Sequence, residues 1–361
     1  MAGGGFSRGR AAAGKPHLGR RYAGRVGEDA RDLGEFGLIE RLVARLGGTG
    51  DGVLVGPGDD AAAVRPRGTV LAAADLLLEG RHFDFAFSSP GDVGWKALAA
   101  NVSDIAAMGG VPRYALVSLG APASTPVATL EALYDGLAEC ARTFGVSVVG
   151  GDTVGSEALV VSVAVLGDAG PAGVVTRSGA RAGDVVCVTG SVGGAAAGLK
   201  LLREAGTDPE ASRLLEKYPE LASLHRRPTP RVREGQAAAS VGATAMVDVS
   251  DGLGADLGHI CERSRLGVEL RAASVPRAEG VDEAARWAGL EPEALALGGG
   301  DDYELLMAIP AAQVKALADA IAPTTVTPIG ELGGAERVVV GSGGDRRPLA
   351  GLGWDHFGSD A

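Results

Sequence analysis

The sequence predicts two α/β domains, and three observations support this prediction. The chain has 361 residues, which is more than one hydrophobic core usually holds, so two domains are expected. Apolar runs of strand length alternate with helix-like segments in both halves, as is typical of α/β proteins. A stretch rich in Gly and Pro at residues 167–173 interrupts this alternation and predicts the connection between the domains. We therefore expect a disordered tail at residues 1–32, an N-terminal domain at 33–167 and a C-terminal domain at 168–361.

The elements of the first domain follow from the spacing of its apolar residues. A first helix is expected from Glu35, because Phe36, Ile39, Leu42 and Val43 recur at helical spacing. Two longer helices are expected at residues 92–108 and 127–144, and Gly145 ends the second of them. Strands are expected at residues 53–55, 69–74, 114–120, 146–149 and 158–166.

The alternation of strands and helices restarts in the second domain. Strands are expected at residues 185–189, 244–249, 267–271, 304–309 and 325–329. Helical stretches are expected between and after them, near residues 193–205, 229–241, 252–264, 280–289 and 310–321. Both domains are therefore expected to be α/β.

Composition excludes several classes of protein. A formal net charge of −11 argues against binding to nucleic acid or to an anionic membrane, because both need a basic surface. The longest apolar run, at residues 158–166, is far shorter than the roughly 20 residues of a membrane-spanning helix. Cys140, Cys187 and Cys261 are too far apart in the sequence to suggest a disulfide framework or a zinc site. We expect a cytoplasmic protein.

The most informative feature is a set of aspartates that we expect where strand-like runs end, the position at which α/β proteins bind ligands. Any one of them could be an ordinary turn or helix-cap residue. Carboxylates that converge without Lys or Arg partners repel one another unless cations hold them, and Mg²⁺ is a hard ion that prefers oxygen ligands. The sequence therefore predicts a magnesium and phosphate site. The aspartates are Asp59, Asp60, Asp75, Asp104, Asp152, Asp248 and Asp251.

The usual nucleotide-binding and nucleophile motifs are absent. Residues 193–198 have the glycine spacing of a P-loop, but Leu199 precedes Lys200 where Gly-Lys-Ser/Thr is required. The turn Thr189-Gly-Ser-Val-Gly-Gly194 could offer backbone N–H groups to an anion, although close packing explains it equally well. Of the scattered histidines, His82 and His225 are the two of interest, and no nucleophilic triad is visible.

Taken in order, the motifs of this chain resemble those of the thiamine-monophosphate kinase family, within the superfamily of aminoimidazole ribonucleotide synthetase. The resemblance covers roughly residues 33–357. The motifs are Gly34-Glu-Phe-Gly-Leu-Ile39, Gly58-Asp-Asp-Ala61, Asp75-Leu-Leu-Leu-Glu-Gly-Arg-His-Phe83, Lys96-Ala-Leu-Ala-Ala-Asn-Val-Ser-Asp-Ile-Ala-Ala-Met-Gly109, Gly150-Gly-Asp-Thr153, Thr176-Arg-Ser-Gly-Ala180, Asp248-Val-Ser-Asp-Gly-Leu253, Gly300-Asp-Asp-Tyr-Glu-Leu305 and Trp354-Asp-His-Phe357.

The resemblance implies two α/β domains with mixed sheets in each subunit, and N-terminal domains that pair into a homodimer with a β-barrel-like core. It implies ATP as co-substrate, thiamine monophosphate as acceptor and several Mg²⁺ ions, with no catalytic base. The implied metal ligands are Asp60, Asp75, Asp104, Asp152, Asp248 and Asp251. The implied ATP contacts are Tyr134, Gly151, Asp152, Arg177 and Ser250, and the implied contacts to thiamine monophosphate are His82, Asp301 and Trp354.

The chain departs from the family pattern around Asp75, where hydroxyl residues are often found and Ala73, Ala74 and Leu76 stand here. In the motif that begins at Gly300, Asp301 replaces a glutamate. Two alternatives are another ATP-dependent enzyme of the superfamily and a non-catalytic nucleotide-binding homologue. Selenophosphate synthetase and hydrogenase maturation factors would need a cysteine near the start or the C-terminus, and the cysteines here lie at 140, 187 and 261.

Overall fold

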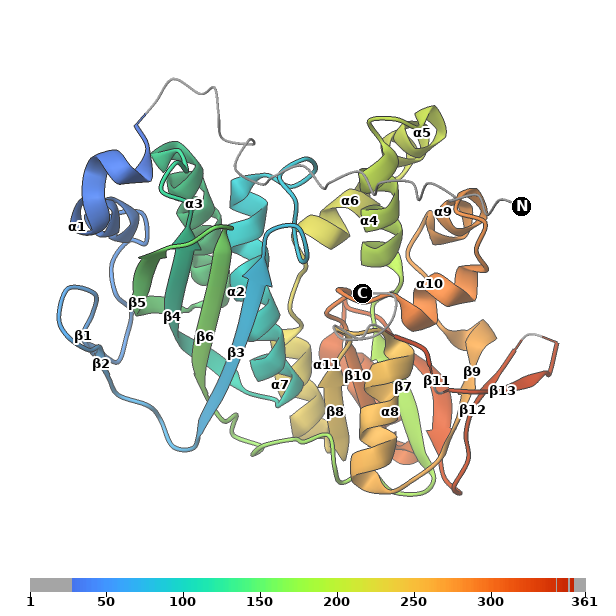
Figure 1. Cartoon of the computed structure of the whole chain (residues 1–361). Helices are drawn as coiled ribbons and strands as arrows, with labels where there is room; N and C mark the ends of the chain where they lie inside the picture. The colour runs from blue at the N-terminus through green and yellow to red at the C-terminus, as the bar shows by residue number, and fades with distance from the viewer. Residues whose placement is uncertain (1–27, 342, 350, 354–361) are drawn as a thin grey trace, which may run out of the picture.

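Figure 1 shows the computed structural model of the chain, which describes residues 28–341, 343–349 and 351–353. Two halves lie side by side, and each has its own β-sheet and helices. The predicted α/β architecture with mixed sheets is therefore confirmed. The first half consists of α1 (Ala30–Val43), β1 (Val53–Val55), β2 (Ala63–Val64), β3 (Val70–Leu78), α2 (Pro90–Ala107), β4 (Val111–Ala121), α3 (Val127–Phe144), β5 (Ser147–Gly155) and β6 (Val160–Asp168).

The main sheet of the first half has the strand order β3-β6-β4-β5. β4 and β5 are parallel and are joined by α3, because a parallel pair needs a crossover connection. The other neighbours in this sheet are antiparallel. Alternate residues of each strand point to opposite faces, so Leu71 and Leu77 of β3 join α2 and α3 in the hydrophobic core.

The other face of this sheet carries apolar side chains that remain exposed. Val70, Leu76, Leu116 and Val154 are 45%, 50%, 41% and 54% exposed, respectively. They come from β3, β4 and β5 and share one face according to the strand register. We call this surface the outer face of the sheet.

The second half is built around a seven-stranded sheet with the order β13-β12-β9-β11-β7-β10-β8. The pair β9 and β12 is parallel, and the other neighbours are antiparallel. The elements are β7 (Asp184–Thr189), α4 (Gly194–Glu204), α5 (Pro209–Lys217), α6 (Pro219–Arg226), α7 (Val232–Val241), β8 (Ala245–Asp248), α8 (Leu253–Ser264), β9 (Val268–Arg271), the 3-10 turn η2 (Ala272–Ser274), α9 (Val281–Trp287), α10 (Pro292–Gly298), β10 (Leu305–Pro310), the 3-10 turn η3 (Ala311–Gln313), α11 (Val314–Ile321), β11 (Val326–Leu332), β12 (Arg337–Val340) and β13 (Arg346–Pro348).

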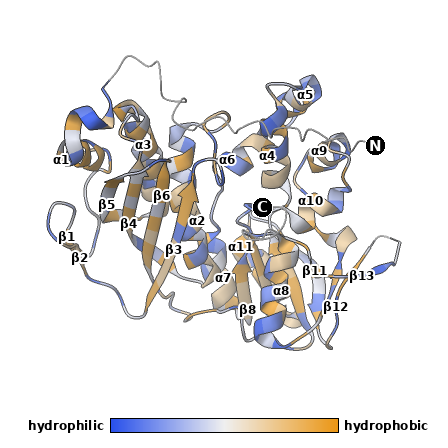
Figure 2. Cartoon of the chain, in the orientation of Figure 1, coloured by the Kyte–Doolittle hydropathy of each residue, from blue (hydrophilic) through white to orange (hydrophobic). Residues whose placement is uncertain are grey.

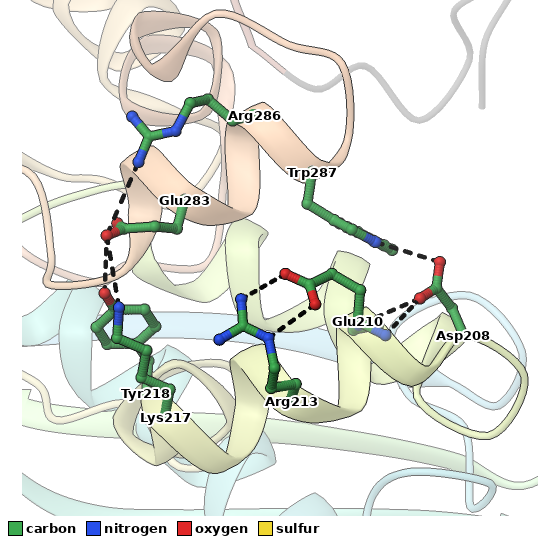
Figure 3. Close-up of polar contacts among 9 residues, drawn as sticks. Asp208, Glu210, Arg213, Lys217, Tyr218, Glu283, Arg286 and Trp287 are labelled. Carbon is green, nitrogen blue, oxygen red and sulfur yellow. Dashed lines mark hydrogen bonds and ion pairs between the residues drawn. The ribbon is translucent and has the colours of Figure 1, made fainter.

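Helices α4, α5, α6, α9 and α10 gather at one end of the second half and share a small hydrophobic core of their own. At the edge of this core, polar contacts connect α5 to α9 (Figure 3). The Tyr218 hydroxyl donates to Glu283 at 2.8 Å, and the Trp287 indole N–H donates to Asp208 at 3.2 Å. Figure 2 shows α5 as mainly hydrophilic and the strands of the four-stranded sheet as mainly hydrophobic. We call this group of helices the helical lobe.

The predicted strands and helices all occur, but several strands run further than the sequence pattern indicated, β3 and β5 the most. β3 continues through Asp75 to Leu78, and β5 continues through Gly150-Gly-Asp-Thr153. Asp75 and Asp152 thus lie inside strands, and Asp104 lies inside α2, so the prediction that these aspartates follow strand ends is wrong.

Several short elements were not predicted: β2, α5, α6, α10, β12 and β13. The connection between the domains was expected at residues 167–173, and residues 169–183 contain no helix or strand, whereas 167 and 168 belong to β6. Of the helices in the described part of the chain, none is long and apolar enough to span a membrane.

Candidate active site

A cleft of about 1060 Å³ lies between the two halves of the chain. The first half contributes β3, the loop after it and α2. The second half contributes α4 and α10 of the helical lobe and the loops around residues 248–251 and 298–303. The cleft therefore brings together motifs that are far apart in the sequence.

Four of the predicted metal ligands line this cleft: Asp75, Asp104, Asp248 and Asp251. We call them the acidic cluster. Burial raises the pKa of Asp104 to about 8, and the negative charges of Asp248 and Asp75 add to this rise. Burial also raises the pKa of Asp248 to about 6, although a hydrogen bond and Arg177 oppose the rise. The pKa of Asp75 rises through burial and through the charge of Asp251.

The geometry of the acidic cluster depends on one turn of α2, Asn101-Val-Ser-Asp104. The Asp75 N–H donates to the side-chain oxygen of Asn101 at 3.0 Å, which fixes β3 against α2. The hydroxyl of Ser103 donates to Asp248 at 2.7 Å, which fixes the end of β8. Asn101 and Ser103 are fully buried. This turn therefore joins the two halves at the point where their carboxylates meet.

Asp256, which the sequence did not single out, shapes the loop that carries Asp251. One of its carboxylate oxygens accepts the N–H groups of Ser250, Asp251 and Gly252 at 3.1, 3.2 and 3.2 Å. Burial raises the pKa of Asp256 to about 8. One ligand atom each from Asp251, Asp256 and His259 lie within 4.8 Å of one another. The sequence signal was the position of Asp256 in the first turn of α8, four residues after Gly252, where an acid interacts favourably with the start of a helix.

Asp301, predicted to contact substrate, lines the cleft and is paired with a cation from the other half. The Lys96 ammonium of α2, which is only 3% exposed, donates to Asp301 at 2.8 Å. The Tyr303 hydroxyl donates to its second oxygen at 3.2 Å. Burial favours the neutral acid, but Lys96 and nearby donors outweigh it and hold the pKa of Asp301 below its ordinary value. Asp301 and Tyr303 have positive φ angles of 70° and 51°, which costs backbone energy.

The neighbouring acids of this loop are structural. Asp302 accepts the N–H groups of Gly193 and Ala195 at 2.6 and 3.1 Å, at the start of α4. One N–H group of the Gly-rich turn at 189–194 and the N–H group of the residue after it are therefore bound to an internal carboxylate. Glu304 receives two bonds from the Arg231 guanidinium, at 2.7 and 2.5 Å.

Of the other predicted contacts, His82, Arg177 and Ser250 also line the cleft. Nδ1 of His82 accepts the N–H of Leu78 at 3.0 Å, so a neutral His82 carries its proton on Nε2. Trp354 lies outside the described residues.

Four predicted residues do not line the cleft. Asp60 is exposed in the loop between β1 and β2. Tyr134 is 5% exposed in the core of the first half, where burial raises its pKa to about 12. Gly151 and Asp152 lie on the edge strand β5. Their predicted roles stay predictions.

The register of the four-stranded sheet shows which way Asp152 faces. Asp152 pairs with Ser118, Ser118 with Ser162 and Ser162 with Leu76. Residues that lie directly opposite each other share a face, so Asp152 is on the outer face with Leu76. Asp75, next to Leu76 along β3, points to the other face. Within one chain, Asp152 is therefore separated from the acidic cluster by the sheet.

The alternation of side chains along β3 also shows on which face of the sheet the residues that depart from the family pattern lie. Ala73 shares the face of Asp75, whereas Ala74 and Leu76 belong to the outer face. The replacement at Ala73 changes the face of the strand that carries the acidic cluster, and Leu76, although on the outer face, also lines the cleft.

A smaller cavity of about 470 Å³ adjoins the cleft. Asp104, Arg177 and Asp248 line both spaces. The remaining wall of the smaller cavity includes Met108 and Met246. The site thus has two compartments that meet at carboxylates and one guanidinium, an arrangement suited to two anionic reactants.

Known proteins resemble this chain over most of its length. Residues 58–169 match the family model of the AIR synthase related protein, N-terminal domain, and residues 181–342 match that of the C-terminal domain. Thiamine-monophosphate kinase from Mycobacterium tuberculosis (strain CDC 1551 / Oshkosh) is 43% identical over 280 residues, which cover 76% of this chain and 80% of that protein.

Two solved structures share the fold at clear sequence identity. The crystal structure of thiamine-monophosphate kinase from Stenotrophomonas maltophilia K279a has a TM-score of 0.74 and 36% identity, covering 86% of this chain and 96% of that one. A structure described as AaThiL complexed with AMPPCP and TMP has a TM-score of 0.69 and 33% identity, covering 91% and 98%.

Proposed function

The chain belongs to the thiamine-monophosphate kinase family of AIR synthase related proteins, and we therefore propose that it transfers the γ-phosphoryl group of ATP to thiamine monophosphate. The products would be thiamine diphosphate and ADP. The similar structure that holds AMPPCP, an ATP analogue, together with TMP supports this pair of substrates.

The observation that carries the proposal is the meeting of the acidic cluster with Arg177 at the border of two compartments. We assign the smaller, Met-lined cavity to the nucleoside of ATP and the larger cleft to thiamine monophosphate. Their phosphates would then meet beside Asp104, Arg177 and Asp248. Arg177 would pair with phosphate oxygens, since a guanidinium binds them with directed hydrogen bonds.

The residues present fit several Mg²⁺ ions. The acidic cluster offers carboxylate oxygens, which Mg²⁺ prefers. In the described part of the chain, no Lys or Arg forms an ion pair with Asp75, Asp104, Asp248 or Asp251, and burial raises the pKa of the first three. Such carboxylates favour bound cations. When bound there, Mg²⁺ would neutralise the phosphate oxygens of both substrates.

The chain itself would position the reactants and would not move a proton. A phosphate monoester has a second pKa of about 6, so the attacking oxygen is largely ionised at neutral pH. Direct in-line transfer then needs alignment and charge neutralisation, and no base. We propose that His82 and Asp301 align the acceptor, with Lys96 keeping Asp301 ionised. Ser250 would contact ATP from the loop shaped by Asp256.

We further propose a homodimer formed by the outer faces of two four-stranded sheets, which would together make a barrel-like core. The exposed apolar side chains Val70, Leu76, Leu116 and Val154 support this arrangement, because a patch of this kind is usually covered by a partner. Gly151 and Asp152 would lie at this interface. ATP as substrate and three free, buried cysteines are compatible with work in the cytoplasm.

A comparison of acceptors tests the proposed function. The purified protein is given ATP, Mg²⁺ and either thiamine monophosphate or thiamine, and ADP and thiamine phosphates are separated by chromatography. We expect thiamine diphosphate when thiamine monophosphate is the acceptor and no phosphorylated product when thiamine is the acceptor, because the alcohol of thiamine would need a base. Phosphorylation of thiamine would contradict the mechanism, and ATP binding without any product would favour a non-catalytic homologue.

A further inference from the structure

His225 is a buried side chain in the cleft that the proposed mechanism leaves unused. It lies on α6, is 3% exposed and lines the cleft beside Asp301. Its Nδ1 has no hydrogen-bond partner, and the nearest carboxylate oxygen, of Asp301, is 3.8 Å away. A buried nitrogen without a hydrogen-bond partner destabilises the folded chain, because it has lost its hydrogen bonds to water. Because Nδ1 of His225 lies at the wall of the cleft, it is available to form a hydrogen bond with a ligand.

The segment that carries His225 is held in place by contacts of the residues that follow it. The next residue, Arg226, donates to the carbonyl oxygen of Phe87 at 2.6 Å. The indole N–H of Trp95 on α2 donates to the carbonyl oxygen of Pro228 at 2.8 Å. These bonds fasten the end of α6 to the first half of the chain. The ring of Phe87, which also lines the cleft, lies 6.2 Å from the imidazole centre.

The surroundings keep His225 neutral. Burial and the cations of Lys96, Arg203 and Arg226 lower its pKa to about 3, and Asp301 opposes them. A neutral imidazole has one N–H donor and one acceptor nitrogen. The cleft wall thus presents an ionised carboxylate, which only accepts, beside an imidazole that can donate.

We propose that His225 is a further substrate-binding residue, whose imidazole acts with the Asp301 carboxylate to bind the aminopyrimidine ring of thiamine monophosphate against Phe87. This inference rests on the proposed function. An aminopyrimidine carries an amino group, which donates, next to a ring nitrogen, which accepts. Asp301 takes the amino N–H, and His225 donates to the ring nitrogen. The aromatic side chain of Phe87 supplies an apolar wall for the ring.

The test compares thiamine monophosphate with its thiazole half, which lacks the methylpyrimidine and the positive charge of the thiazolium ring. Thiamine monophosphate and its thiazole half, 4-methyl-5-(2-phosphooxyethyl)thiazole, are titrated by calorimetry into the full chain with Mg²⁺ and AMPPCP. His225→Phe removes the hydrogen bonds and keeps a ring, and His225→Gln keeps an amide donor. We expect His225→Phe to weaken thiamine monophosphate about tenfold, the usual effect of losing one buried hydrogen bond. The thiazole phosphate and AMPPCP should bind as before, and His225→Gln should recover part of the loss.

Leu221→Val provides the matched control. Leu221 is fully buried one turn earlier on α6 and does not line the cleft. This variant should lower the melting temperature and leave the Kd of thiamine monophosphate unchanged. Equal weakening of both acceptors by His225→Phe, or no weakening, would overturn the inference.

The steady-state constants separate this inference from the proposed function. If the wild-type protein binds thiamine monophosphate but forms no diphosphate, the proposed function fails and the calorimetric comparison still decides the role of His225. If diphosphate forms and His225→Phe changes neither Kd nor KM, only the inference fails. A raised KM with an unchanged kcat supports both.

Discussion

Replacing Asp104 by Asn should stabilise the metal-free protein and abolish its response to Mg²⁺. Burial raises the pKa of Asp104 from 3.8 to about 8. The unfolded carboxyl group loses its proton near its ordinary pKa, whereas the folded group keeps it to about pH 8. The contribution of Asp104 to stability is therefore fully present below about pH 4 and is lost as the pH rises to about 8.

The size of this effect follows from the pKa shift. One pKa unit corresponds to about 1.4 kcal/mol, so the rise from 3.8 to about 8 corresponds to about 6 kcal/mol at pH 8. Asp104 titrates together with Asp248, whose pKa rises to about 6, so part of this cost falls on the neighbour. We expect Asp104→Asn to relieve roughly half, about 3 kcal/mol at pH 8 and less than about 1 kcal/mol at pH 5.

Urea unfolding at pH 5 and pH 8, with EDTA or with Mg²⁺, measures these free energies of unfolding. Mg²⁺ should stabilise the wild type more at pH 8 than at pH 5, because binding requires ionised carboxylates, and should leave Asp104→Asn nearly unchanged. Asp319→Asn, an exposed aspartate on α11 paired with Lys315, is the control and should behave as wild type. The reasoning would be refuted if Asp104→Asn were less stable than the wild type at pH 8 in EDTA, or if Mg²⁺ raised its free energy of unfolding as much as that of the wild type.

Three further predictions concern groups that act on the site from a distance. Asp256→Ala removes the acceptor of three backbone N–H groups and should lower the free energy of unfolding by about 3 kcal/mol. Calorimetry should also show weaker binding of ATP with Mg²⁺. Unchanged binding would contradict the role given to the loop that carries Ser250 and Asp251. Lys96→Met leaves Asp301, whose side chain is 34% exposed, without its cation and should lower the free energy of unfolding by about 2 kcal/mol in urea, less than for a fully buried pair. Adding Asp301→Asn should restore most of that loss, and additive losses would show that the two residues are not coupled. Leu116→Glu places a charge on the outer face at a side chain that does not line the cleft, and it should convert a dimer to a monomer in sedimentation equilibrium. An unchanged mass would show that this face is not the interface.

The order of strands and helices could be predicted from the sequence because long amphipathic segments carry a clear period. The 18-residue helices α2 and α3 are clear examples. Helices α5, α6 and α10 begin at Pro209, Pro219 and Pro292 and have nine, eight and seven residues. Segments this short show little periodicity, and their helical state depends on packing in the helical lobe.

The acidic site could be predicted only in part, because residue types were visible and side-chain directions were not. Asp75, Asp104, Asp248 and Asp251 meet as expected. Asp152 faces the other side of the sheet, and the sequence did not reveal this. β5 continues through Gly150 and Gly151, and two glycines have no side chains that would show the alternating pattern of a strand.

Other features of the site depend on tertiary contacts that no local pattern records. The role of Asp256 in the site depends on three backbone N–H groups that point toward its carboxylate. Lys96 pairs with a residue more than 200 positions away. The environment of His225 likewise comes from both halves of the chain.

The most direct test of the central claim is a stoichiometric assay of phosphoryl transfer. The wild type and Asp104→Ala are incubated with ATP, Mg²⁺ and thiamine monophosphate, and thiamine diphosphate and ADP are quantified by chromatography. We predict equal amounts of the two products for the wild type, and loss of both for Asp104→Ala. ADP without thiamine diphosphate, or full activity of the variant, would contradict the assignment of the acidic cluster as the site of transfer.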